Sequence, residues 1–142
     1  MAVRSSRAEW RGDLKGGNGE FEVGEGVFSG AYTFASRFEE GDGTNPEELL
    51  AAAHAACFSM ALSGALGRAG SPPESIRTEA KVHLEAVDGQ QTITKVELTT
   101  RGTVPGIDAD AFREHAEGAK AGCPVSRLFA GAEITVDAQL EG

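Results

Sequence analysis

The chain has 142 residues, of which 40% are hydrophobic and 25% charged, proportions typical of one folded domain spanning residues 1–142. Its 22 acidic and 13 basic residues give a net charge of −9, which repels phosphate backbones and anionic lipid. We therefore expect no nucleic acid and no membrane surface among its partners. The first 15 residues lack the apolar run of a signal peptide, and two cysteines do not make a disulfide scaffold, so a cytoplasmic location is predicted.

Short alternating runs separated by glycines occupy the first 40 residues. Trp10 and Phe21 belong to two such runs, and a third begins at Val27 after Gly24 and Gly26. This pattern is typical of β-hairpins. The polar segment 39–43 that follows is predicted to be an exposed loop.

A long helix is predicted to begin at Asn45. Asn is a favourable N-cap, Pro46 suits the first helical position, and Glu47 complements the positive end of the helix dipole. Residues 49–67 carry no charge, which is better explained by a helix inside the protein than by a membrane span. Leu50, Ala53, Cys57, Met60 and Gly64 share one face at helical spacing, and because the opposite face is also small and apolar, we expect the helix to be covered on most sides.

Strands and two further helices account for the remaining chain. An Asp88-Gly89 turn joins the alternating runs 76–85 and 92–100, Asp108 caps a helix that ends near Gly122, and 134–140 alternate again. A short helix is expected from Cys123-Pro124 to Phe129. The predicted fold class is α+β, with a mostly antiparallel sheet and a buried central helix that carries the first cysteine.

The two cysteines are the candidate chemical groups. Both Cys57 and Cys123 could be inert packing residues, but Cys123 lies at a predicted helix start, where backbone N–H groups favour a thiolate. His54 lies three residues before Cys57 and could be a half-buried polar residue or the base of a Cys–His nucleophile pair. No metal is expected, because the cysteines form no CxxC pair and no histidine stands at metal-ligand spacing.

Two long motifs resemble the OsmC/Ohr family of hydroperoxide peroxidases. One is the run TNPEELL, continuing through HAACFSMAL, which covers residues 44–62; the other is AKAGCPVS at residues 119–126. The segment VPGID at 104–108 also fits. The residues around Cys57 and the run SRFE at 36–39 are similar to the OsmC branch of the family.

The resemblance implies a peroxidase that needs no cofactor. It implies that Cys57 attacks a hydroperoxide, that Cys123 resolves the product to a disulfide, and that Arg37 and Glu47 complete the site. Arg11 is a competing candidate for the arginine. A dithiol of lipoyl type is the expected reductant, with organic hydroperoxides preferred over hydrogen peroxide. A thiol hydrolase built on Cys57 and His54, and a non-catalytic binding module on the same fold, are the alternative functions.

Helix geometry adds an expectation about assembly. Ten residues of helix separate Glu47 from Cys57 by ~15 Å along the axis and turn the two side chains about 80° apart. If the family role of Glu47 holds, it must serve the Cys57 of another chain. We therefore expect an OsmC-like intertwined homodimer with composite sites.

Overall fold

The computed structural model describes residues 1–141. The chain forms two compact units, Met1–Leu49 and the part that begins at Leu50. The division falls inside the long helix α2 (Pro46–Arg68), whose first turn belongs to the first unit. By length and composition alone α2 could cross a membrane, but one side of it is buried in the core of the second unit.

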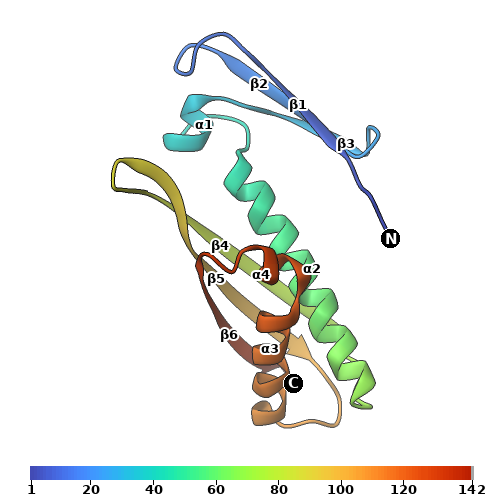
Figure 1. Cartoon of the computed structure of the whole chain (residues 1–142). Coiled ribbons are helices and arrows are strands. Elements are labelled where there is room, and N and C mark those ends of the chain that lie inside the picture. The colour runs from blue at the N-terminus through green and yellow to red at the C-terminus, as the bar shows by residue number, and fades with distance from the viewer. Residues whose placement is uncertain (142) are drawn as a thin grey trace. The chain divides into compact units, whose positions relative to one another are not determined.

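The first unit is built on a three-stranded antiparallel sheet (Figure 1). It consists of β1 (Ser6–Arg11), β2 (Asn18–Val23) and β3 (Phe28–Tyr32), in that order, as the alternating runs predict. Gly19 pairs with Trp10 on one side and Tyr32 on the other, and a Cβ at this position would lie 2.6 Å from the Tyr32 ring. The missing side chain allows the two aromatic rings to approach to 5.4 Å between centroids.

The short helix α1 (Phe34–Phe38) was not predicted, and this part of the sequence-based interpretation was wrong. The Thr33 hydroxyl accepts a hydrogen bond from the N–H of Ser36 at 3.0 Å, and the Ser36 hydroxyl accepts one from the N–H of Thr33 at 2.8 Å. This reciprocal capping stabilises a helix that is too short to show hydrophobic periodicity. The Thr33–Ser36 spacing was the signal that could have revealed it.

Helix α2 begins where its sequence predicts and ends at a glycine. The Asn45 side chain accepts a hydrogen bond from the N–H of Glu48 at 2.8 Å, as an N-cap does. At the other end Gly70 has φ +88°, and the N–H of Ser71 donates to the carbonyl of Leu66 at 2.9 Å. This left-handed glycine and the bond that follows it end the helix.

The second unit places helices on one face of a three-stranded sheet. Strands β4 (Ser75–Val87) and β5 (Gln90–Thr103) form an antiparallel hairpin through Asp88 and Gly89, both with positive φ, and β6 (Glu133–Glu141) pairs parallel to β5. The predicted α+β fold with mostly antiparallel pairing is confirmed.

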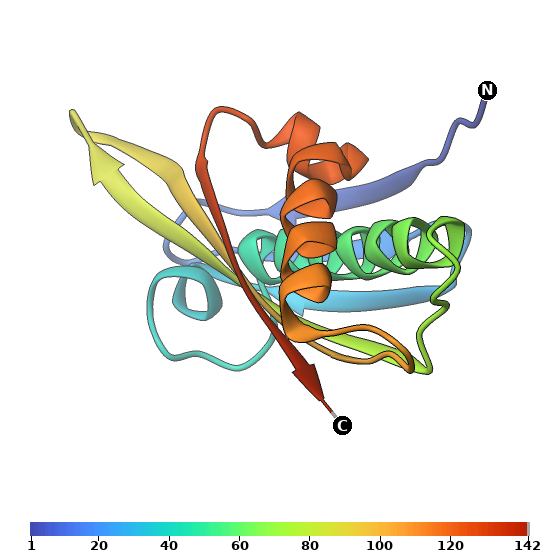
Figure 2. The ribbon, with the colours of Figure 1, turned by 90° about the horizontal axis from the view of Figure 1, so that it is seen from below.

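Helix α3 (Ala109–Gly122) is capped by Asp108 and leads into α4 (Pro124–Leu128). Figure 2 shows α3 running across the direction of α2. Both helices contribute to one core with β5 and β6, which contains Phe58, Leu62, Leu66, Val96, Leu98, Val104, Phe112, Ala116, Ala119 and Ala138.

Only one side of α2 is buried, and it is not the face on which Cys57 and Met60 share helical spacing. It consists of His54, Phe58, Leu62 and Leu66, whereas Met60 is 78% exposed. The expectation that the helix is covered on most sides also fails for the single chain, since Ala52, Ala53 and Ala56 are exposed as well. Because the helix is apolar on every side, periodicity could not identify the side that meets the sheet.

Candidate active site

The two cysteines meet in the second unit. Cys57 lies in the middle of α2, and Cys123 lies at the junction where α3 ends and α4 begins. Their sulfur atoms are 2.9 Å apart, with Cys57 half-buried and Cys123 fully buried. A disulfide requires about 2.05 Å between sulfurs, so only a small movement would join these two within one chain.

The surroundings of the two thiols affect their acidity in opposite directions. Burial raises the pKa of Cys57, and its hydrogen bond with Cys123 raises it further. Burial acts in the same sense on Cys123, but hydrogen bonds from Cys57, from the Ser126 N–H and hydroxyl, and from the Val125 N–H outweigh it and lower the pKa of Cys123. Within residues 50–141, no cation is among the groups that shift the pKa of Cys57. The thiolate is therefore favoured on Cys123, as its place at the start of α4 predicts.

His54 is directed toward α4 rather than paired with Cys57. Its Nε2 lies 2.7 Å from the Ser126 hydroxyl, and its ring meets Phe129 edge-on at 5.4 Å between centroids. The side chain is fully buried, and burial lowers the pKa of His54. Since this nitrogen is engaged with Ser126, the geometry does not favour a Cys–His nucleophile pair.

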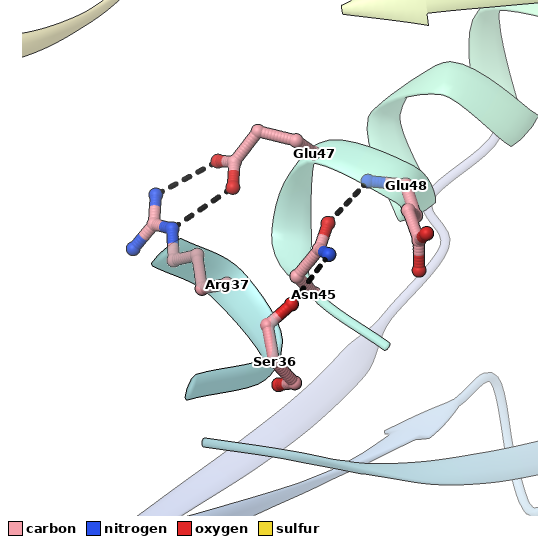
Figure 3. Close-up of polar contacts among 5 residues, drawn as sticks. All are labelled: Ser36, Arg37, Asn45, Glu47 and Glu48. Carbon is pink, nitrogen blue, oxygen red and sulfur yellow. Dashed lines mark hydrogen bonds and ion pairs between the residues drawn. The ribbon is translucent and has the colours of Figure 1, made fainter. Parts of the chain in front are cut away.

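Arg37 and Glu47 form a two-pronged ion pair in the first unit (Figure 3). Arg37 donates from Nε to Glu47 Oε1 at 2.9 Å and from Nη2 to Oε2 at 2.8 Å. The hydrogen bonds to Glu47 raise the pKa of Arg37, so this guanidinium is always charged. Glu47 is 9% exposed and the Arg37 side chain 36%, which leaves part of the guanidinium free to meet a further anion.

Asn45 connects the segments that carry this ion pair. Besides capping α2, its side-chain amide donates to the carbonyl of Ser36 at 2.9 Å (Figure 3). The first turn of α2, which carries Glu47, is thereby tied to α1, which carries Arg37. Sequence reasoning identified Asn45 as a cap but missed this second contact, because the partner is a backbone atom in an unpredicted helix.

The competing arginine has different surroundings. Arg11 lies at the end of β1 and pairs with Glu9 and with Glu20, whose oxygen is 3.5 Å away, and all three side chains are about half exposed or more. Glu9 and Glu20 belong to the sheet surface rather than to α2. Among residues 1–141, no cluster of three histidine, cysteine or acidic side chains could hold a metal ion.

Two thiols that face each other on an α+β fold are typical of a protein of cysteine-based redox chemistry. Residues 39–139 match the family of OsmC-like proteins. Over 139 residues the chain is 52% identical to Peroxiredoxin OsmC of Escherichia coli, covering 97% of this chain and 96% of that protein. The chain belongs to the OsmC-like family.

Solved structures agree with this assignment. The organic hydroperoxide resistance protein OhrB of Bacillus subtilis is 26% identical, with a TM-score of 0.74, covering 99% of this chain and all of the other. The organic hydroperoxide resistance protein OsmC of Legionella pneumophila is 22% identical and shares the fold, with a TM-score of 0.73 and both chains fully covered. The expected family and the expected thiol-dependent peroxidase are confirmed.

Proposed function

We propose that this enzyme reduces organic hydroperoxides through Cys57 and Cys123. The observation that carries the proposal is the 2.9 Å separation of the two sulfurs in a chain that belongs to a peroxidase family. The Cys57 thiolate attacks the peroxide, the O–O bond breaks, an alkoxide leaves and is protonated to the alcohol, and Cys57 becomes a sulfenic acid. Cys123 then displaces water from this sulfenic acid to form the disulfide.

A dithiol of lipoyl type is the proposed reductant. Reopening the disulfide takes two electrons and two protons, which a dithiol supplies while it closes to its own disulfide. The names of the two structural relatives, both organic hydroperoxide resistance proteins, support organic hydroperoxides as the substrate class.

The active site we propose is composite, with Arg37 and Glu47 of one chain serving Cys57 of a second. Cys57 needs a cation, because burial raises its pKa and residues 50–141 supply none among the groups that shift it. Helix α2 runs without interruption from Glu47 to Cys57, so the ~15 Å between them cannot be shortened by a kink. An arginine from a second copy would supply the charge.

Exposed apolar surface also supports a second copy. Every fully buried apolar side chain within residues 1–141 comes from Phe58 or later, while Phe28 is 52% exposed and Met60 78% exposed. A small sheet needs an apolar face that packs against another element to be stable in water. A homodimer would cover the aromatic side chains of the first unit and the free side of α2.

Stoichiometric oxidation tests the thiol chemistry. One equivalent of cumene hydroperoxide should convert the reduced protein to a monomer-sized species with a Cys57–Cys123 bridge, detected by denaturing electrophoresis and peptide mapping. Cys57→Ser should abolish consumption of cumene hydroperoxide in the presence of dihydrolipoyl dithiol. Cys123→Ser should allow one turnover and then stall, with Cys57 as the sulfenic acid or over-oxidised. Sustained turnover by Cys57→Ser would refute the mechanism.

A further inference from the structure

His54 is a fully buried titratable side chain that the proposed peroxidase steps do not use. It lies one turn before Cys57 on α2, yet its polar contact is with Ser126 on α4, 72 positions along the chain. A buried imidazole in contact with a buried hydroxyl, next to one of the reacting thiols, is a candidate for a role in the reaction.

The proton of His54 can be assigned to one ring nitrogen. Burial lowers the pKa of His54, so the ring is neutral at neutral pH and carries a single N–H. Nδ1 is buried and has no hydrogen-bond partner within residues 1–141. A buried N–H without a partner is more costly than a buried lone pair without one. The proton therefore sits on Nε2, which donates to the Ser126 hydroxyl at 2.7 Å.

The hydrogen bond from His54 affects where the Ser126 hydroxyl can donate its own proton. A serine hydroxyl has one proton to donate, and accepting a hydrogen bond from His54 leaves that proton free for another group. Ser126 is the third residue of α4 and Cys123 is its N-cap, so the two residues belong to the same first turn of the helix. Ser126 is among the groups that lower the pKa of Cys123.

We propose that His54 is a positioning residue for the resolving cysteine: it orients the Ser126 hydroxyl so that this hydroxyl can donate to the Cys123 sulfur and stabilise it as a thiolate. The inference rests on the proposed Cys57–Cys123 chemistry and assigns a role in it to the polar contact between α2 and α4. His54 touches neither reacting sulfur in this scheme, and it acts by orienting Ser126.

The step that this relay serves is closure of the disulfide. The Cys123 thiolate attacks the sulfur of the Cys57 sulfenic acid, an S–S bond forms, and the S–O bond breaks. The leaving hydroxide takes up the proton that Cys123 released on ionising, and water departs. The Cys123 sulfur is oxidised and the Cys57 sulfur is reduced by one unit each, so no further oxidant or reductant is needed.

The neighbouring charges do not replace this relay. Cys57 is the titratable group that acts on the Cys123 sulfur from α2. On α3, Lys120 pairs with Glu117 at 2.9 Å, and on α4 Arg127 is exposed. Burial alone shifts the pKa of His54, so no charged side chain of the described chain competes with Ser126 for it.

Thiol titration of the full-length protein tests the proposal. In a Cys57→Ser background Cys123 is the remaining thiol, and the ultraviolet absorbance of its thiolate gives its pKa directly. Ser126→Ala and His54→Phe should each raise that pKa by about one unit, a roughly tenfold loss of thiolate near neutral pH. Ser126→Thr, which keeps the hydroxyl, and His54→Gln, which keeps a donor, should stay near the parent value. His83→Gln, on the exposed side of β4, is the matched control.

A double variant distinguishes the relay from simple packing. If His54 acts through Ser126, then His54→Phe should change nothing further once Ser126→Ala is present. Equal shifts in both backgrounds, or no shift with either single variant, would overturn the proposal. NMR of the wild-type ring nitrogens needs no variant: we expect the Nε2–H form of His54, and the Nδ1–H form would contradict the relay even if His54→Phe failed to fold.

The same variants with both cysteines present connect the result to catalysis. After one equivalent of hydroperoxide, His54→Phe should convert the Cys57 sulfenic acid to the disulfide about tenfold more slowly at neutral pH, with the difference vanishing at high pH. The absorbance titration requires no turnover. A shifted Cys123 pKa in a protein that forms no disulfide would therefore refute the proposed function and leave the relay standing.

Discussion

At the scale of single residues, the ion pair between Arg37 and Glu47 depends on the shape of the guanidinium as well as on its positive charge. The guanidinium uses two nitrogens on two carboxylate oxygens, at 2.9 and 2.8 Å, and its central carbon lies 5.2 Å from the centre of the Phe38 ring. A carboxylate and an aromatic face therefore hold one cation in a single orientation. A lysine would keep the positive charge but could not donate two parallel hydrogen bonds to the carboxylate.

If Arg37 serves Cys57 as proposed, Arg37→Lys should lower kcat/KM for an organic hydroperoxide by about 10- to 100-fold, because one charge-assisted hydrogen bond is lost. Steady-state assays with dihydrolipoyl dithiol measure it. Arg11→Lys is the matched control and should stay within about twofold, because exposed ion pairs contribute little. A large loss with Arg11→Lys and none with Arg37→Lys would contradict the proposed role of Arg37 and favour Arg11.

At the scale of helices and strands, one local device in each unit positions a helix. Asn45 both caps α2 and binds the carbonyl of Ser36, so one side chain fixes the start of the long helix relative to α1. Gly102 in β5 lets the ring of Phe112 approach the strand: a Cβ there would lie 2.5 Å from Phe112 Cε1 and 3.1 Å from Ile76 Cδ1. Each device can be tested by removing it.

Asn45→Ala should lower the free energy of unfolding by about 1 kcal/mol or more, since it removes an N-cap together with a second hydrogen bond. Urea denaturation monitored by circular dichroism measures this value. Asn45→Asp keeps the oxygen that caps α2 and loses the amide that donates to Ser36, so it should fall between Asn45→Ala and the wild type. Equal losses for the two variants would mean that capping contributes nothing here.

Gly102→Ala should destabilise the protein by about 1–3 kcal/mol, because the added methyl group overlaps the buried Phe112 ring. Gly118→Ala is the control: it lies on α3, nothing lies within 4 Å of its added Cβ, and it should stabilise the helix by about 0.4–1 kcal/mol. Thermal unfolding of the two variants should therefore shift in opposite directions. A neutral Gly102→Ala would show that Phe112 can move aside without loss.

At the scale of the whole molecule, the composite site predicts complementation between inactive subunits. Cys57→Ser and Glu47→Ala chains should each be impaired as homodimers, but a mixed dimer keeps one site that has Cys57 of one chain with Arg37 and Glu47 of the other. Refolding the two variants together and purifying the heterodimer through two affinity tags should recover about half of the wild-type activity. No recovery in a verified heterodimer, or full activity of a monomer, would eliminate the composite site.

Much of this protein follows from local chemistry that is visible in the sequence. Asn45 and Asp108 cap the helices they were expected to cap, Asp88-Gly89 turns the long hairpin, and alternation marks the strands. These features are predictable because each depends on residues within about four positions of one another. The two cysteine motifs likewise indicate the family and the thiol chemistry, because a motif is recognised from residue types alone and needs no knowledge of which residues are in contact.

The three-dimensional structure alone decided which groups meet. Helix α2 is apolar on all sides, so only packing against β5 and α3 could choose His54 and Phe58 for burial and leave Met60 exposed. The contact between His54 and Ser126 joins two segments far apart in the chain, and no local rule places them together. The relative acidity of Cys57 and Cys123 was decided in the same way, because burial and the start of α4 act on the two sulfurs only once the fold has brought them within 2.9 Å.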